Sequence, residues 1–291
     1  MTVKVSVLMP VYNTNGDMLR QTIESILNQT FTDFEFLIVN DCSTDENVEK
    51  IVLEYQQKDS RIKYFMNEKN LGISGTRNKL IDLSQGEYLA VMDHDDISLP
   101  NRFEKQVEFL DKNLEVGVVS SWYEIFPETK FVKYPTNDFD IKVNLMRNCT
   151  LLHPASMIRK SVLAENNLRY EADFSPAEDY GLWIRLIKLT KFANIPEILF
   201  KYRVHGNNES IKQNTKMLNR TYFINKIIKK ELPDLLELSN NILGTTKYIK
   251  LFNTIPFLKI TEKYNIKEYK LFDVFTILSI KHKGIKWKEY F

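Results

Sequence analysis

Three carboxylates within four positions follow directly on an apolar run. Residues 88–92 (Tyr-Leu-Ala-Val-Met) lead straight into Asp93, His94, Asp95 and Asp96. Like charges this close repel one another, so they either spread into water or share a cation. Two acids separated by one residue suit a hard divalent ion such as Mg2+ or Mn2+, with phosphate oxygens completing its coordination. The alternative is a solvated turn that starts the next helix.

Three other acidic residues and one histidine lie next to the expected ends of strands or helices. Asp41 follows an apolar run, where an acid is either a helix cap or an acceptor for an N–H of a ligand base. Glu178 and Asp179 begin a helical pattern, where the helix dipole alone favours acids. The same position would hold a catalytic base rigidly at the mouth of a cleft. A lone histidine more often has a structural role than a ligand role, but His205 follows a late strand in a Gly/Asn loop, which strengthens the case for a metal or phosphate contact.

The stretch 70–78 (Asn-Leu-Gly-Ile-Ser-Gly-Thr-Arg-Asn) contains only two glycines. It does not match the G-x-G-x-x-G pattern, so a dinucleotide site is poorly supported. Arg77 within it either meets a phosphate or forms a surface ion pair.

Alternating strand and helix patterns must position these residues. Strands are expected at 5–11, 34–39, 62–65 and 88–92, with helices at 18–28, 46–57 and 74–83 between them. The connections are too long for hairpins, which predicts a parallel sheet with helices on both faces. Because the carboxyl ends of parallel strands lie along one edge, Asp41 and Asp93 should line one crevice. Pro10 should end the first strand, since proline cannot donate to a ladder.

The pattern loosens in the second half of the chain. Expected there are helices at 101–113, 140–146 and 161–166 and from 178, and strands at 116–120, 155–158 and 199–204. From residue 211 onward, Lys and apolar residues recur at helical spacing, which predicts a mostly helical extension. We therefore expect two parts, residues 1–210 and 211–291.

Length and composition limit the class of protein. The 291 residues are 43% hydrophobic, which is ample for a large core, and carry a net charge of only +2. A general nucleic-acid binder is not indicated by that charge. Cys42 and Cys149 are too few for a disulfide framework or a cysteine zinc cluster, which fits a reducing compartment. Neither a signal peptide nor an apolar run long enough to span a bilayer is expected.

Six short motifs occur along the chain in a particular order. They are Pro10-Val-Tyr-Asn13, Asn40-Asp41 with Ser43, Asn70-Leu-Gly72 with Arg77-Asn78, Met92-Asp-His-Asp-Asp96, Glu178-Asp179-Tyr180 with Leu182-Trp183, and Tyr202-Arg-Val-His205 with Ser210. Over residues 3–210 this order resembles the family 2 inverting glycosyltransferases. The resemblance implies the α/β architecture called the GT-A fold, with a mostly parallel central sheet flanked by helices. Two positions depart from the family pattern: Asn40, where the family often has Asp, and the bulky His94.

The resemblance also implies an activity and its residues. A hexose or N-acetylhexosamine would pass, with inversion, from a UDP-sugar to a hydroxyl of a glycan or lipid-linked acceptor. Donor contacts would come from Pro10, Tyr12, Asn13, Asp41, Gly72, Arg77 and Asp93. Mn2+ or Mg2+ would be held by Asp95, Asp93 and His205, and would offset charge on the departing UDP. Asp179, rather than Glu178, would be the base that activates the acceptor.

The remaining expectations concern setting and alternatives. Assembly of bacterial surface polysaccharide or lipooligosaccharide is the expected role, in the cytoplasm. Residues 241–291 carry ten Lys against four acids, a net of +6. This charge suits peripheral contact with the anionic inner face of the plasma membrane. A helical cap or a homodimer contact is the alternative. A nucleotidyltransferase, or a non-catalytic nucleotide-sugar-binding module, could use the same fold.

Overall fold

The computed structural model describes residues 3–206, 208, 214–243, 245–251, 255–263, 266–271 and 275–281. They form two compact units, residues 1–226 and 227–291. The first unit holds the α/β sheet expected from the sequence and all of the candidate site residues.

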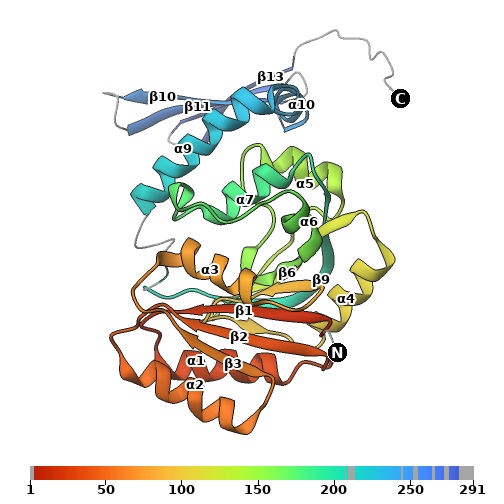
Figure 1. Ribbon diagram of the computed structural model, residues 1–291. Helices are drawn as coiled ribbons and strands as arrows, with labels where there is room; N and C mark the ends of the chain where they lie inside the picture. The colour runs from red at the N-terminus through yellow and green to blue at the C-terminus, as the bar shows by residue number, and fades with distance from the viewer. Residues whose placement is uncertain are drawn as a thin grey trace. The chain divides into compact units, whose positions relative to one another are not determined.

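The N-terminal half of the first unit alternates strictly between strand and helix, as predicted. Its strands are β1 (Val5–Val11), β2 (Phe34–Asn40), β3 (Ile62–Met66) and β4 (Tyr88–Val91). The connecting helices are α1 (Gly16–Leu27), α2 (Glu46–Lys58) and α3 (Gly72–Leu83). The strands pair in parallel in the order β3-β2-β1-β4. With α1 and α2 on one face and α3 on the other (Figure 1), β1 and β2 are buried at every position, which explains their continuous apolar sequence.

The first strand has the expected bounds, 5–11, and Pro10 is its penultimate residue. The strand continues to Val11, and Pro10 lies opposite Val39 of β2 in the register. Alternate residues of β1 bond to β2 and to β4, and Leu8 O accepts from Met92 N on the β4 side. The missing N–H of Pro10 faces that same side, beyond the last paired residue of β4, so no ladder bond is lost.

The second half of the first unit adds shorter elements to the same sheet. They are β5 (Ile97–Ser98), α4 (Arg102–Lys112), β6 (Val116–Phe126), β7 (Lys130–Val132), α5 (Asp138–Leu145), η1 (His153–Ala155), β8 (Met157–Arg159), α6 (Lys160–Glu165), η2 (Ala172–Phe174), α7 (Glu178–Leu186) and β9 (Lys191–Arg203). The sheet is extended by β8-β6-β9-β5, with β7 beside β6. This half mixes antiparallel pairs with the parallel pair β6–β9.

The short strand β5 decides which loops meet. It follows the acidic loop 93–96 and pairs antiparallel with the end of β9, with Ile97 opposite Lys201. The loop that follows β9 is therefore brought beside the loop that follows β4, although the two are more than a hundred positions apart in the chain.

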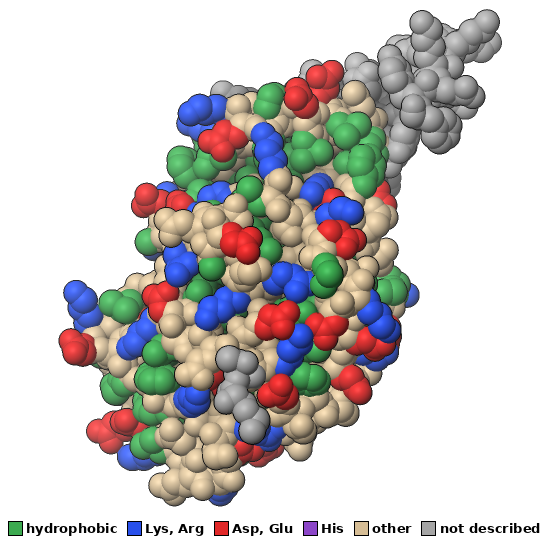
Figure 2. All heavy atoms as spheres, turned by 45° about the vertical axis from the view of Figure 1, so that its right-hand side comes forward, with side chains coloured by type: hydrophobic (Ala, Val, Ile, Leu, Met, Phe, Trp, Pro, Cys, Tyr) green, Lys and Arg blue, Asp and Glu red, His purple; other side chains and the backbone are tan. Residues whose placement is uncertain are grey.

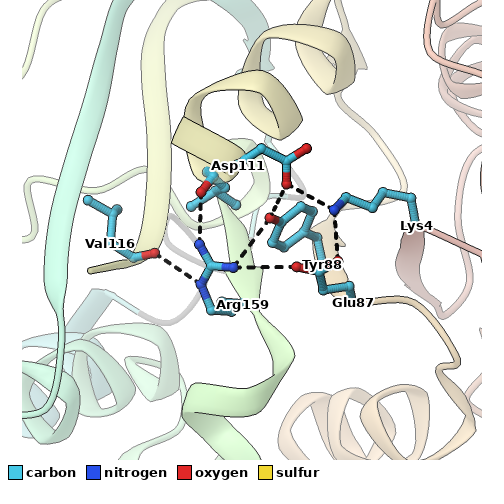
Figure 3. A network of polar contacts seen from close by, with 7 residues as sticks. Lys4, Glu87, Tyr88, Asp111, Val116 and Arg159 are labelled. Carbon is cyan, nitrogen blue, oxygen red and sulfur yellow. Dashed lines mark hydrogen bonds and ion pairs between the residues drawn. The ribbon is translucent and has the colours of Figure 1, made fainter. Parts of the chain in front are cut away.

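A second polar network lies at the opposite end of β4 (Figure 3). Tyr88 donates its hydroxyl to Asp111 at 2.5 Å, and Arg159 lies over the Tyr88 ring at 5.2 Å from its centroid. Lys4 bridges Glu87 and Asp111 at 2.7 and 2.9 Å. The face shown in Figure 2 carries Lys and Arg side chains interspersed with Asp and Glu, so on the coloured part of that face neither sign of charge gathers alone.

The C-terminal unit differs from the expected mostly helical extension. The predicted helices are present as α9 (Asn214–Glu231), which crosses the division between units, and α10 (Pro233–Leu243). An antiparallel sheet in chain order then follows: β10 (Thr245–Leu251), β11 (Ile255–Lys263), β12 (Ile266–Leu271) and β13 (Phe275–Lys281). These segments are rich in Ile, Thr, Tyr and Phe, whose preference for strands outweighs the helical spacing of the lysines. Of the helices described, none combines the length and apolar character needed to cross a bilayer.

Candidate active site

Asp41, at the end of β2, is held rigidly. Its Oδ1 accepts from Asn67 Nδ2 at 2.7 Å and from Leu71 N at 2.8 Å. Asn70 donates its side-chain amide to the Asp41 carbonyl at 3.2 Å. Asp41 is buried. These bonds join the ends of β2 and β3 to the start of α3, so the carboxylate has one fixed position at the carboxyl edge of the sheet.

Asn13 joins the loops that follow β1 and β2. Its backbone has φ of 46°, in the region that Asn tolerates better than most residues. Asn13 Oδ1 accepts from the backbone N–H groups of Thr44 and Asp45 at 2.8 and 3.2 Å. The Asn13 side-chain oxygen therefore organises this loop, while the neighbouring Tyr12 ring is 45% exposed.

Gly72 begins α3 with φ of +71°, a left-handed conformation in which a side chain is strained. Its N–H donates to Asn70 Oδ1 at 3.0 Å. Gly72 therefore allows the backbone turn that leads into α3. The same helix carries Arg77.

Arg77 connects two of the predicted acidic sites. Nη2 donates to Asp93 Oδ1 at 3.0 Å, and Nη1 donates to Glu178 Oε1 at 2.5 Å. The guanidinium is buried and lies 5.6 Å from the centroid of the Tyr170 ring. Burial opposes its charge, but the carboxylates of Asp93 and Glu178 outweigh burial and raise the pKa of Arg77. The surface ion pair considered from the sequence is wrong, because Arg77 is buried and bridges two carboxylates. Its contact with a phosphate stays a prediction.

Glu178 and Asp179, adjacent at the start of α7, have different surroundings. Glu178 is buried and ion-paired with Arg77. Asp179 is half-buried, and its Oδ1 accepts from Tyr180 N at 2.7 Å. Burial first, and then the charge of Glu178, raise the pKa of Asp179 to about 6, against an opposing effect of Arg77. Asp179 therefore combines a raised pKa with the lack of a bonded cation among the residues that the structure describes.

The acidic loop is tied to the end of β9. His205 Nε2 lies 2.9 Å from Asp95 Oδ2. Arg203 donates its Nε to the Asp95 carbonyl at 2.6 Å and its backbone N to Asp96 Oδ1 at 2.7 Å. Asp96 is fully buried, and burial followed by the charges of Asp95 and Asp93 raises its pKa well above the ordinary value. The sequence predicted Asp93, Asp95 and His205 but missed the roles of Asp96 and Arg203.

The expected metal ligands are only partly assembled. Asp95 and His205 are in contact and offer an oxygen and a nitrogen, which are donors that Mn2+ accepts. Asp93 instead gives one oxygen to Arg77. Across the described ranges, no group of three His, Cys, Asp or Glu side chains converges on one point. The donor chemistry fits a divalent ion at two of the three predicted residues.

Several buried polar atoms around this edge have no hydrogen-bond partner among the residues described. They are Arg77 Nε, His94 Nδ1, Asp96 Oδ2 and Glu178 Oε2. Native proteins leave few such atoms unpaired, because each costs about 1–3 kcal/mol. Unpaired polar atoms of this kind are typical of places that take up a water, an ion or a polar ligand.

A buried tyrosine–histidine pair next to Arg77 was also not predicted from the sequence. Tyr170 and His153 share a hydrogen bond of 2.7 Å between the Tyr170 hydroxyl and His153 Nε2. No role for His153 followed from the sequence. The available signal was its place in a Leu-His-Pro-Ala stretch next to a short strand, which does not reveal a partner from residue 170.

The comparisons agree with this fold. Residues 6–166 match the model of "Glycosyl transferase family 2". An uncharacterized glycosyltransferase of Methanocaldococcus jannaschii is 37% identical over 75% of this chain and 77% of its own length.

Two solved structures share the fold at low identity. Staphylococcus aureus TarS 1-349 in complex with UDP-GlcNAc has a TM-score of 0.61 at 19% identity, over 72% of this chain and 60% of that one. The mannosyltransferase PcManGT of Pyrobaculum calidifontis, in complex with GDP-Man and Mn2+, has a TM-score of 0.59 at 15% identity, over 74% and 61%. This chain thus spans less than two thirds of either structure. The predicted resemblance and GT-A fold are confirmed, and the chain belongs to glycosyl transferase family 2.

Proposed function

We propose that this glycosyltransferase moves a hexose or N-acetylhexosamine from a UDP-sugar to an acceptor hydroxyl, with inversion at the anomeric carbon. The observation that carries the proposal is the unequal pair at the start of α7. Glu178 is ion-paired with Arg77, whereas Asp179 has a pKa raised to about 6 and no bonded cation among the described residues. An inverting transfer needs one such base near the acceptor hydroxyl, and no protonating acid, because UDP is already a good leaving group.

The donor end of the site would be the edge formed by the loops after β1 and β2. Tyr12 presents an exposed ring that could stack on a base, and Asp41 is fixed as an acceptor for a base N–H. Pro10 and Asn13 shape the same loop, and Gly72 starts the helix that carries Arg77. The UDP-GlcNAc bound by TarS supports a uracil nucleotide for this chain. Because PcManGT binds GDP-Man, the test must compare donors with different nucleotides.

A divalent cation would be held by Asp95 and His205, with Asp93 nearby. Mn2+ or Mg2+ bound there would neutralise charge that develops on the leaving diphosphate. Arg203 fixes the acidic loop, because it donates hydrogen bonds to both the Asp95 carbonyl and the Asp96 carboxylate. The Mn2+ in PcManGT supports the same choice of ion.

The acceptor would be a glycan or a lipid-linked glycan in surface polysaccharide or lipooligosaccharide assembly. The basic segment 241–291, with its net charge of +6, supports approach to an anionic membrane surface. Part of that segment, residues 282–291, lies outside the described residues. The homodimer contact expected as an alternative remains a prediction.

The test is a donor screen with the full chain. UDP, GDP and TDP sugars are incubated with and without glycan acceptors, with Mn2+, Mg2+ or chelator, and nucleotide release is measured. The anomeric configuration of any product is then read by NMR coupling constants. UDP release with an inverted product supports the proposal. Release only from GDP-sugars refutes the assigned nucleotide. Tight binding without turnover favours a binding module, and pyrophosphate release from a nucleoside triphosphate favours a nucleotidyltransferase.

A further inference from the structure

A histidine and a tyrosine from distant segments form a buried pair next to the site. His153 lies in η1, and Tyr170 lies between α6 and η2. His153 Nε2 and the Tyr170 hydroxyl are 2.7 Å apart, and their rings are nearly perpendicular with centroids 5.5 Å apart. His153 also packs on Trp183 of α7, at 5.7 Å between ring centroids. The pair therefore touches the helix that begins with Glu178 and Asp179.

The same tyrosine is fastened to the helix that carries Arg77. Asn78 donates its side-chain amide to the Tyr170 carbonyl at 2.8 Å and accepts from the Tyr170 N–H at 2.9 Å. These two hydrogen bonds fix the Tyr170 backbone to Asn78 of α3, the residue after Arg77. The guanidinium of Arg77 then lies 5.6 Å from the centroid of the Tyr170 ring, where a cation is attracted to the ring.

Both members of the pair are neutral. Burial, and then the charge of Arg77, lower the pKa of His153 well below its ordinary value. Burial raises the pKa of the Tyr170 hydroxyl, so it stays protonated. No second positive charge is therefore placed against Arg77. The pair gives the guanidinium a polar but uncharged neighbour at the Tyr170 ring.

We propose that Tyr170 and His153 are positioning residues for sugar transfer. This inference rests on the proposed function of Asp179. The pair holds Arg77 where it bridges Asp93 and Glu178, and so keeps the cation from forming a direct ion pair with Asp179. Asp179 is the alternative partner, because its carboxylate already attracts Arg77. A guanidinium bonded to Asp179 would occupy a carboxylate lone pair. That lone pair would then be unable to accept the proton of the acceptor hydroxyl.

The test compares graded variants in the full-length protein. Tyr170→Phe removes the hydroxyl but keeps the ring against Arg77, and Tyr170→Leu removes both. We expect kcat to fall about threefold and about tenfold, respectively, with the UDP dissociation constant unchanged, because Asp41 and Tyr12 lie on other loops. Arg77→Lys, alone and combined with each variant, completes a double-mutant cycle. If Tyr170 acts through Arg77, the double variants are no slower than Arg77→Lys alone.

A matched control exists at the far end of β4 (Figure 3). Tyr88 also donates its hydroxyl in a partly buried network and also packs against an arginine, Arg159. Tyr88→Phe removes a comparable bond and should lower the melting temperature without changing kcat.

The outcomes separate the two proposals. Wild-type protein that transfers no sugar overturns the proposed function. Active wild-type protein with unchanged kcat in both Tyr170 variants overturns only the positioning role, as do effects of Tyr170 and Arg77 that multiply in the double variants. Should Tyr170→Leu fail to fold, Tyr170→Phe with and without Arg77→Lys gives the same decision.

Discussion

Arg77 and Glu178 form a buried ion pair across 101 positions of the chain, with 2.5 Å between Nη1 and Oε1. This ion pair makes the surroundings of Glu178 differ from those of the next residue, Asp179. Asp179 shares the helix start with Glu178 but not its cation, and its pKa is raised to about 6. Burial and the neighbouring Glu178 carboxylate raise the pKa of Asp179, whereas Arg77 opposes the rise. The two adjacent carboxylates thus have different surroundings, Glu178 bonded to a cation and Asp179 with a raised pKa.

The first prediction concerns the base. Asp179→Asn keeps the shape of the side chain and removes its basicity, so kcat should fall about 100-fold or more. The affinity for the UDP-sugar, measured by calorimetry, should stay close to that of the wild type. Glu178→Gln is the neighbouring control, and it should lower stability more than Asp179→Asn because it leaves Arg77 buried beside an uncharged partner. Normal turnover by Asp179→Asn together with loss in Glu178→Gln would move the assignment to Glu178.

The second prediction concerns pH. A base must be deprotonated to act, so kcat of the wild type should decline as pH falls through about 6, the raised pKa of Asp179. Burial raises this pKa most and the charge of Glu178 next, whereas Arg77 lowers it. In Glu178→Gln the raising charge is gone and Arg77 remains, so the acidic limb of the residual activity should move to lower pH. A limb that moves upward in this variant would show that another group titrates.

The third prediction concerns the metal. Asp95→Ala and His205→Ala should each weaken binding of Mn2+ and reduce transfer, because their side chains supply the two donors that already touch. Mn2+ binding is measured directly by electron paramagnetic resonance, with and without UDP, and so does not depend on turnover. Unchanged transfer in excess chelator would contradict metal dependence, and unchanged Mn2+ affinity in both variants would place the ion elsewhere.

The fourth prediction concerns the basic segment 241–291. A net charge of +6 should favour vesicles that contain anionic lipid over neutral ones, and the preference should weaken as salt is raised. Sedimentation of the full chain and of a chain ending at residue 240, each with both kinds of vesicle, measures this. Equal binding of the full chain to neutral and anionic vesicles would argue against a membrane contact.

The sequence was most informative where local patterns determine structure. The alternating elements up to residue 92 were predictable because buried parallel strands and amphipathic helices have distinct periods, and all four strands are found in the expected places. The strand β6 was underestimated: it continues to Phe126, past the expected end at residue 120. Its later residues are only partly buried and mix polar with apolar types, so they carry no clear period.

The sequence named candidate residues but not the contacts between them. Asp93, Arg77 and Glu178 were each identified from their motifs, yet no sequence rule states that a single guanidinium lies between the two carboxylates. The contact of Tyr170 with His153 was likewise hidden, because it depends on how η1 and the loop before η2 pack in three dimensions. Long-range side-chain geometry of this kind is decided by tertiary packing, which short motifs do not encode.

The last prediction concerns the loop that precedes the two acids. A Cβ added to Gly181 would lie 2.5 Å from Cγ of Phe174, so Gly181→Ala must push η2 away from α7. The loop can move little, because Arg220 of α9 donates to the Ser175 carbonyl at 3.2 Å and the ring of Phe223 packs 5.7 Å from that of Phe174. Such overpacking costs about 1–3 kcal/mol.

Gly181→Ala should therefore lower the melting temperature and, by displacing Glu178 and Asp179, reduce kcat about tenfold while leaving UDP affinity unchanged. Gly16→Ala is the control, since its added Cβ meets only the flexible end of Ile51 at 3.0 Å, in a region distant from α7. Adding Phe174→Leu to Gly181→Ala reopens the space and should restore part of both stability and kcat. Loss of UDP affinity with normal kcat in Gly181→Ala, or no recovery in the double variant, would show that this contact does not set the position of the acids.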